Sequence, residues 1–178
     1  AWAEAGDPTG YDRLLSAARA AEPRRSLVDP DAEAFSIDGS MPAQIRSYCR
    51  RTGQAVPDTH GAVVRCLLDS VVTKTALALD QLEAAAGMSP DRLVLGGGGA
   101  RNELFCRLLA DATGRPVETG PVEATAVGNL LTQAVGIGTL PDLSVGRKLV
   151  EASFGTDTYD PGDGWPAAKE RLRALTEA

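Results

Sequence analysis

The sequence has 178 residues, a formal net charge of −6 and an apolar share of 43%. That length allows one domain with a hydrophobic core and barely allows two. We expect no nucleic-acid partner, because no basic patch is interleaved with aromatic residues. We also expect no membrane partner and a cytoplasmic location, because no apolar run approaches the ~20 residues of a membrane span and no signal peptide is recognisable.

The first half of the sequence predicts helices. Residues 9–21 have the pattern of a short amphipathic helix, and residues 41–53 have the early proline and late glycine of a second one. The longest predicted element follows, because neither proline nor glycine interrupts residues 62–86. At 1.5 Å per residue this helix would be about 35–40 Å long, and Asp58 or Thr59 can cap its start.

Two features of this half resemble functional sites only superficially. Asp29, Asp31 and Asp38 lie in one irregular connection, but they lack the spacing and the closing glutamate of a calcium loop. We therefore expect turn and capping chemistry there, and no metal site in the chain. His60 is the only histidine and has no nucleophile signature around it, so we expect a surface residue in a first helical turn.

The second half changes to short strands that alternate with helices. Residues 92–95 form an apolar strand candidate, residues 102–114 a helix, and residues 115–119 another extended segment. This order predicts parallel strands joined by a helical crossover. We therefore expect a helix-rich α/β fold with short parallel strands.

Three more helices are predicted towards the end. Residues 122–138 form the first, and Gly128 in its interior is expected to allow close contact with a neighbouring helix. Residues 144–154 form a further candidate, and a loop with a terminal helix closes the chain. The sequence begins without an initiator methionine, so we expect it to be a piece of a longer protein.

The three cysteines do not form a secreted disulfide framework, because they are few and odd in number. Cys49 and Cys66 belong to neighbouring predicted helices and can pack close together. We expect buried, inert thiols there. Cys106 is expected to face the core from its helix.

Four consecutive glycines follow the first strand candidate, in the stretch "RLVLGGGGARNELF" (residues 92–105). A dinucleotide fingerprint fails, because position 101 or 102 should then be a third glycine. A P-loop fails as well, because no Gly-Lys-Ser/Thr follows. A looser reading remains, in which the turn and the following helix start present N–H groups to an anionic or polar ligand, with Asn102 in the first turn. The alternative is a tight turn without a ligand.

The residue patterns of several segments resemble those of the C-terminal lobe of the FGGY carbohydrate kinases, which belong to the actin-like ATPase superfamily. The glycine motif is shared across that superfamily, whereas "GPVEATAVGN" together with "YCRRTGQAVP" is most similar to the rhamnulokinase group of the family. The resemblance runs from about Leu27 to Tyr159. It implies a partial actin-like, ribonuclease H-like α/β lobe that binds nucleotide.

The resemblance also implies the partners and the site. It implies phosphoryl transfer from ATP to the sugar L-rhamnulose with Mg²⁺ as a helper, and ADP as the product. By the motif, Gly97, Gly98 and Gly99 form the adenosine-side turn, and Asn102 lies beside the nucleotide. No segment matches the N-terminal lobe of the family, so we assign no catalytic residue, and the chain alone is not expected to catalyse the transfer.

We therefore expect a single domain over residues 1–178, with a helical and irregular connection in 1–60, an α/β core in 61–140 and a C-terminal segment in 141–178. Two alternatives stay open. One is another kinase of the same family, acting on xylulose, ribulose, fuculose or glycerol. The other is a nucleotide-binding module that has no catalytic activity.

Overall fold

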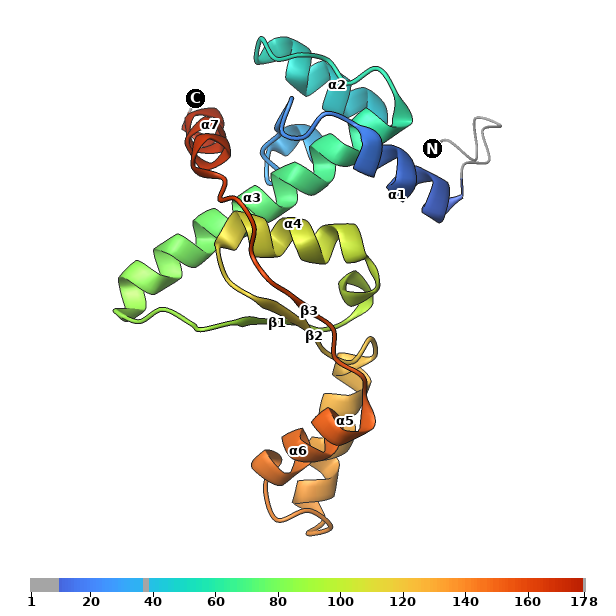
Figure 1. Ribbon diagram of the computed structural model, residues 1–178, viewed down its shortest axis with the longest axis vertical. Helices are drawn as coiled ribbons and strands as arrows, with labels where there is room; N and C mark the ends of the chain where they lie inside the picture. Colours follow the sequence, from blue (N-terminus) through green and yellow to red (C-terminus); the bar gives the residue numbers. More distant parts are fainter. Residues whose placement is uncertain (1–9, 37–38, 178) are drawn as a thin grey trace. The chain divides into compact units, whose positions relative to one another are not determined.

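The computed structural model describes residues 10–36 and 39–177, so the predicted start of the first helix at Thr9 lies outside the described residues, as does Asp38. The chain divides into two compact units (Figure 1). Unit 1 combines Ala1–Gly87 with Gly164–Ala178, and unit 2 is Met88–Asp163. The single domain over 1–178 stays a prediction, because two compact units can still fold together.

In the described residues of unit 1, all the regular elements are helices, joined by irregular segments. Its elements are α1 (Tyr11–Ala20), the short 3-10 turn η1 (Glu33–Phe35), α2 (Met41–Arg51), α3 (His60–Ala86) and α7 (Pro166–Thr176). The long helix α3 begins where the sequence indicates, because the Thr59 side chain accepts a hydrogen bond from the N–H of Ala62. It ends at Gly87, whose left-handed φ of 66° few other residues adopt without strain.

A small apolar core joins α2 to α3 and to the segment before them. It consists of buried Val28, Ile45, Tyr48, Cys49, Val63 and Cys66, with Ala32 and Phe35 packed against them. Polar groups fix the segment that carries Val28. The N–H of Val28 donates to Ser70 Oγ (2.9 Å), and the Gln54 amide bonds to both the N–H and the carbonyl of Leu27 (2.9 and 2.7 Å).

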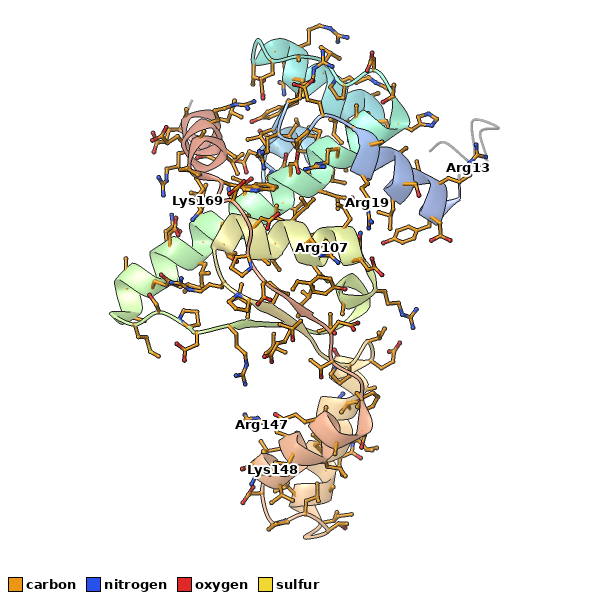
Figure 2. The ribbon with its side chains drawn as sticks, in the orientation of Figure 1. Arg13, Arg19, Arg107, Arg147, Lys148 and Lys169 are labelled. Carbon is orange, nitrogen blue, oxygen red and sulfur yellow. The ribbon has the colours of Figure 1, made fainter. Side chains whose placement is uncertain are left out.

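The last helix, α7, packs against the first part of the chain in unit 1. Leu172 of this helix is fully buried, and Lys169, labelled in Figure 2, pairs with Asp80 of α3 at 2.9 Å. Arg171 donates to the carbonyl of Arg24 at 2.7 Å. A terminal helix was predicted, but its partner was not, because an apolar face on a helix does not reveal which surface it covers.

Unit 2 contains a small sheet, with helices between and after its first two strands (Figure 1). Its elements are β1 (Leu93–Leu95), the 3-10 turn η2 (Gly98–Arg101), α4 (Glu103–Thr113), β2 (Val117–Thr119), α5 (Ala124–Gly136), α6 (Leu143–Ser153) and β3 (Thr158–Tyr159). β1 and β2 pair in parallel, with Leu93 opposite Val117 and Leu95 opposite Thr119. The helix-rich α/β fold with short parallel strands is thus confirmed.

Two expectations about unit 2 need correction. The predicted closing loop contains β3, which pairs with β2 in the antiparallel direction. Its two residues give no strand pattern, and its partner lies about 40 residues earlier. Gly128 does not contact a neighbouring helix, because a Cβ added there would meet no described atom within 4 Å. It lies on an exposed face of α5.

Candidate functional site

The glycine turn lies where the two parallel strands end. Beyond Leu95 the ladder continues for one more step, because the N–H of Gly120 donates to the Leu95 carbonyl at 2.9 Å. The N–H of Gly97 donates to the carbonyl of Pro121 at 3.0 Å. The residues that follow β2 therefore hold the glycine turn at the carboxyl end of β1, in the position where α/β sheets commonly place ligands.

Two of the four glycines are required by the fold. A Cβ on Gly96 would lie 2.9 Å from Cβ of Ala124 in α5, which is closer than two such carbons approach. Gly97 has φ of 83° and ψ of −168°, a conformation essentially restricted to glycine. These two positions explain how the chain turns sharply between β1 and η2.

The next two glycines have no such structural reason. Gly98 and Gly99 are exposed, and neither has a φ in the left-handed range. A Cβ on Gly98 would meet no described atom within 4 Å, and one on Gly99 would make only ordinary contacts at 3.9 Å and beyond. The first N–H groups of a helical turn have no acceptor within that turn. The start of η2 therefore has polar backbone groups that no side chain of Gly98 or Gly99 covers.

Asn102 connects this turn to α4. Its side-chain oxygen accepts a hydrogen bond from the N–H of Phe105 at 3.0 Å, and its own N–H donates to the Gly99 carbonyl at 3.0 Å. The residue is 7% exposed. The sequence pointed to this amide as a ligand contact, and the structure adds an N-cap role that occupies its oxygen.

Cys106 supports the turn from below. Its thiol lies 3.9 Å from the carbonyl oxygen of Gly99 and 3.8 Å from that of Ala100. It is fully buried, as predicted, and burial raises the pKa of the thiol above its ordinary value. Cys106 therefore packs as a neutral, unreactive thiol against the backbone of Gly99 and Ala100.

A groove of about 580 Å³ opens beside the turn within unit 2. Its lining includes three residues that contact the glycine turn, Gly120, Pro121 and Ala124. Apolar side chains form most of its lining, among them Val94, Val127, Leu131, Leu143 and Phe154. This groove could not be predicted from the sequence, because its lining residues come from strands and helices spread over residues 92–156.

The four predicted site residues, Gly97, Gly98, Gly99 and Asn102, thus lie together in the short segment between β1 and α4. Their role toward a nucleotide stays a prediction. Gly120 and Pro121 were not predicted as part of the site, although the Gly-Pro pair that follows β2 was the available signal. Among residues 10–36 and 39–177, no group of three or more His, Cys, Asp or Glu side chains is placed to hold a metal ion. No helix in the same residues is long and apolar enough to span a membrane.

The acidic connection in unit 1 has a structural explanation. Lys74 of α3 pairs with Asp29 at 2.8 Å and with Asp31 at 3.1 Å. A lysine ammonium between two carboxylates reduces their mutual repulsion and anchors the connection to α3. The expected turn chemistry is also present, because the N–H of Asp31 donates to the carboxylate of Asp29 at 3.2 Å.

Comparison with known proteins concerns the chain as a whole. The model of the C-terminal domain of the FGGY family of carbohydrate kinases matches residues 1–137. A rhamnulokinase of Bacteroides thetaiotaomicron is 40% identical over 162 residues, which are 90% of this chain and 33% of that protein. A rhamnulokinase of Bacillus subtilis is 32% identical over 153 residues, 86% of this chain and 32% of that protein. The chain therefore spans about a third of the length of these relatives.

Solved structures show the same fold. Plasmodium falciparum glycerol kinase with ADP superposes with a TM-score of 0.63 at 14% identity, over 99% of this chain and 34% of that one. Xylulose kinase from Rhodospirillum rubrum gives a TM-score of 0.55 at 21% identity, over 99% of this chain and 34% of that one. The fold is of the actin-like ATPase type, and the chain belongs to the FGGY family of carbohydrate kinases, whose C-terminal domain it comprises.

Proposed function

We propose that this chain is the ATP-binding domain of a kinase that transfers the γ-phosphoryl group of ATP to L-rhamnulose, giving L-rhamnulose 1-phosphate and ADP. One observation supports nucleotide binding: the fold itself does not require glycine at positions 98 and 99. The fold has room for a side chain at Gly98. A surface without a side chain at that position serves a ligand that lies directly against the backbone.

The turn offers chemistry suited to a nucleotide. Peptide N–H groups at the start of η2 are hydrogen-bond donors, and an exposed backbone without side chains can pack against a nucleoside. Asn102 holds the turn in register with α4 through its cap and its bond to Gly99. Its amide NH₂ group is left to donate to a ligand. The ADP named with the Plasmodium glycerol kinase is a ligand of that protein and agrees with this assignment.

Mg²⁺ fits the proposal as a partner of the nucleotide. Magnesium in kinases is commonly held by one or two carboxylates together with substrate phosphates. The described residues offer no acidic cluster for it, so the phosphates of ATP and carboxylates elsewhere in the polypeptide would be its ligands. When bound, the ion would neutralise charge that develops on the transferred phosphoryl group.

The sugar assignment depends on the relatives. Two rhamnulokinases are 32–40% identical over most of the chain, whereas the xylulose and glycerol kinase structures are 14–21% identical. L-Rhamnulose is therefore the first substrate to test. Another ketose or glycerol is the second, since those kinases share the fold.

The test uses the complete polypeptide that contains this sequence. ADP release is followed with L-rhamnulose, L-fuculose, D-xylulose, L-ribulose and glycerol in parallel, with ADP binding measured separately by calorimetry. We expect ADP to bind and L-rhamnulose to give the highest kcat/KM. Turnover of another sugar would overturn the rhamnulose assignment alone. ADP binding without turnover of any sugar would overturn the kinase assignment in favour of a non-catalytic nucleotide-binding module.

A further inference from the structure

The sheet of unit 2 has an open edge along β1. Its strand order is β1-β2-β3, so β1 pairs on one side only within the described part of the chain. On that side, the N–H of Leu93 donates to the carbonyl of Pro116 at 2.8 Å, and the carbonyl of Leu95 accepts from the N–H of Gly120 at 2.9 Å. Successive residues of a strand direct their backbone groups to opposite sides, so the N–H and carbonyl of Val94 face away from β2. They form an unpaired strand edge.

The side chain of Val94 is uncovered as well. It is 68% exposed, whereas its neighbours Leu93 and Leu95 are partly buried on the other face of the sheet. In the register of the two parallel strands Val94 stands opposite Glu118, and both residues line the groove of unit 2. The open edge of β1 and the groove are therefore parts of one continuous surface.

The two helices that complete the groove lack a core of their own. Among the described residues, α5 has no buried residue and α6 has only one, Gly146. Their exposed large apolar residues are Leu130, Ile137, Leu143, Val145, Leu149 and Phe154. Helices of 13 and 11 residues gain most of their stability by packing an apolar face against another element. The pair therefore needs an apolar partner beyond the residues that the structure describes.

The chemistry of the edge specifies an extended strand as the partner. The outward N–H and carbonyl of Val94 are satisfied together by the carbonyl and N–H of an extended backbone laid beside β1. A helix cannot replace that strand, because its backbone groups already bond to one another. Alternate side chains of an added strand point to one face of the sheet, so apolar residues at those positions would cover Val94.

The size of the sheet and of the relatives points to the same polypeptide as the source of this strand. The three strands have three, three and two residues, whereas sheets most often have about four to six strands of about five residues. The chain covers only 33% and 32% of two rhamnulokinases. A segment of the same polypeptide is present at any protein concentration. A second copy would pair two edges of three residues, which gives few hydrogen bonds.

We propose that the open edge of β1 and the groove beside it are the docking surface for an extended, apolar segment of the same polypeptide that lies outside residues 1–178. The segment joins the sheet as a further strand, bonded to the backbone of Val94. Its apolar side chains cover the Val94 side chain and enter the groove between the sheet and the helices α5 and α6. This inference does not depend on the proposed nucleotide or sugar.

Backbone hydrogen exchange of the complete polypeptide tests the strand pairing. The N–H of Leu93 is the internal reference, because the carbonyl of Pro116 accepts its hydrogen bond. We expect the N–H of Val94 to exchange at least about 100-fold more slowly than in an unstructured peptide, as that of Leu93 does, because the added strand accepts its hydrogen bond. A Val94 N–H that exchanges at nearly the unstructured rate, beside a protected Leu93 N–H, would overturn the proposal.

Photo-crosslinking identifies what lies on the edge. The photoreactive p-benzoylphenylalanine replaces Val94 in the complete polypeptide, and linked peptides are mapped by mass spectrometry. We expect a link within one chain, to a segment outside residues 1–178. A link between two chains would assign the edge to a second copy, and a link confined to residues 1–178 would show that this chain covers its own edge. Either result would overturn the proposal.

Leu82 of α3 provides the control position for the crosslinking. Its side chain is 66% exposed, close to the value for Val94, and it does not line the groove. We expect p-benzoylphenylalanine at this position to give no link to the segment that Val94 identifies. The same linked segment from both positions would show reaction with a mobile part of the polypeptide, and the docking surface would be refuted.

Discussion

Asp69 is a carboxylate that the fold buries completely and supplies with partners. Arg65, one helical turn earlier in α3, donates from Nε to it at 2.8 Å, and the N–H of Arg24 donates to its other oxygen. Arg24 has φ of 56°, an uncommon conformation for a residue with a side chain. The carboxylate therefore helps to hold the chain in an unfavourable turn against α3.

Burial gives Asp69 a measurable effect of pH on stability. Burial raises the pKa of this carboxyl, and the opposing effects of Arg24 and Arg65 do not cancel that rise. A raised pKa means that the folded state binds the proton more tightly than the unfolded state. Its contribution to stability is therefore fully present below the ordinary carboxyl pKa and is lost as the pH rises through the raised value.

We accordingly expect the free energy of unfolding of the native protein, relative to that of Asp69→Asn, to fall as the pH rises above about 4. Asparagine cannot titrate, so the variant lacks this contribution at every pH. Urea unfolding followed by Trp165 fluorescence, in a Trp2→Phe background, gives both free energies. A difference that is constant with pH, or that grows with pH, would contradict the assignment.

Asn102 combines a cap with a proposed ligand contact, and substitutions can separate the two. Aspartate is as good an N-cap as asparagine, but it lacks the NH₂ donor. We expect Asn102→Asp to keep the folded stability while the apparent KM for ATP rises severalfold. Asn102→Ala should also lose about 1 kcal/mol of stability through the cap. If Asn102→Asp left ATP kinetics unchanged in the complete polypeptide, Asn102 would be a cap alone.

At the scale of elements, the packing of α1 on α3 depends on one glycine. A Cβ on Gly61 would lie 2.5 Å from the carbonyl oxygen of Ala17 and 2.6 Å from its carbonyl carbon. These are backbone atoms, which a side-chain rotation cannot move away. The start of α3 can therefore approach α1 only without a side chain at this position.

We expect Gly61→Ala to destabilise unit 1 by about 1–3 kcal/mol, the usual cost of overpacking. Gly128→Ala is the matched control. It places the same methyl group in a helix at a site with no described atom within 4 Å, and it should stabilise α5 by about 0.5–1 kcal/mol. Urea unfolding of both variants measures whether each substitution lowers or raises the free energy of unfolding. Equal effects would show that the contact with Ala17 is not a constraint.

The same elements show which parts of the fold could be predicted from the sequence and which could not. The extents of α3 and α4 followed from the apolar spacing, from Thr59 and from Gly87 and Gly114, because caps are local signals. β3 and the partner of α7 did not, because they depend on residues distant in the chain. At the site, the turn itself was predictable, but the reason for each glycine was not. The three-dimensional structure is needed to distinguish Gly96 and Gly97 from Gly98. The fold requires glycine at the first two positions and does not require it at the third.

At the scale of the whole molecule, the chain spans about a third of the curated relatives it matches. It holds a glycine turn with its supports in unit 2 and a helical unit that includes the last helix, α7. The described residues contain no cluster of metal-ligating side chains. The proposed nucleotide binding is therefore tested at the glycine turn of unit 2, and the proposed transfer to a sugar is tested in the complete polypeptide.

The most direct test of the central claim is the apparent KM for ATP of Gly98→Val in the complete polypeptide, measured beside the KM for the sugar. Gly164→Val is the control, because Gly164 is also exposed and an added Cβ there meets only one ordinary contact at 3.9 Å. We predict that Gly98→Val raises the KM for ATP by about tenfold, equivalent to about 1.4 kcal/mol, and leaves the KM for the sugar and the folded stability nearly unchanged. An unaltered KM for ATP in a folded Gly98→Val protein would show that the nucleotide does not lie against this turn.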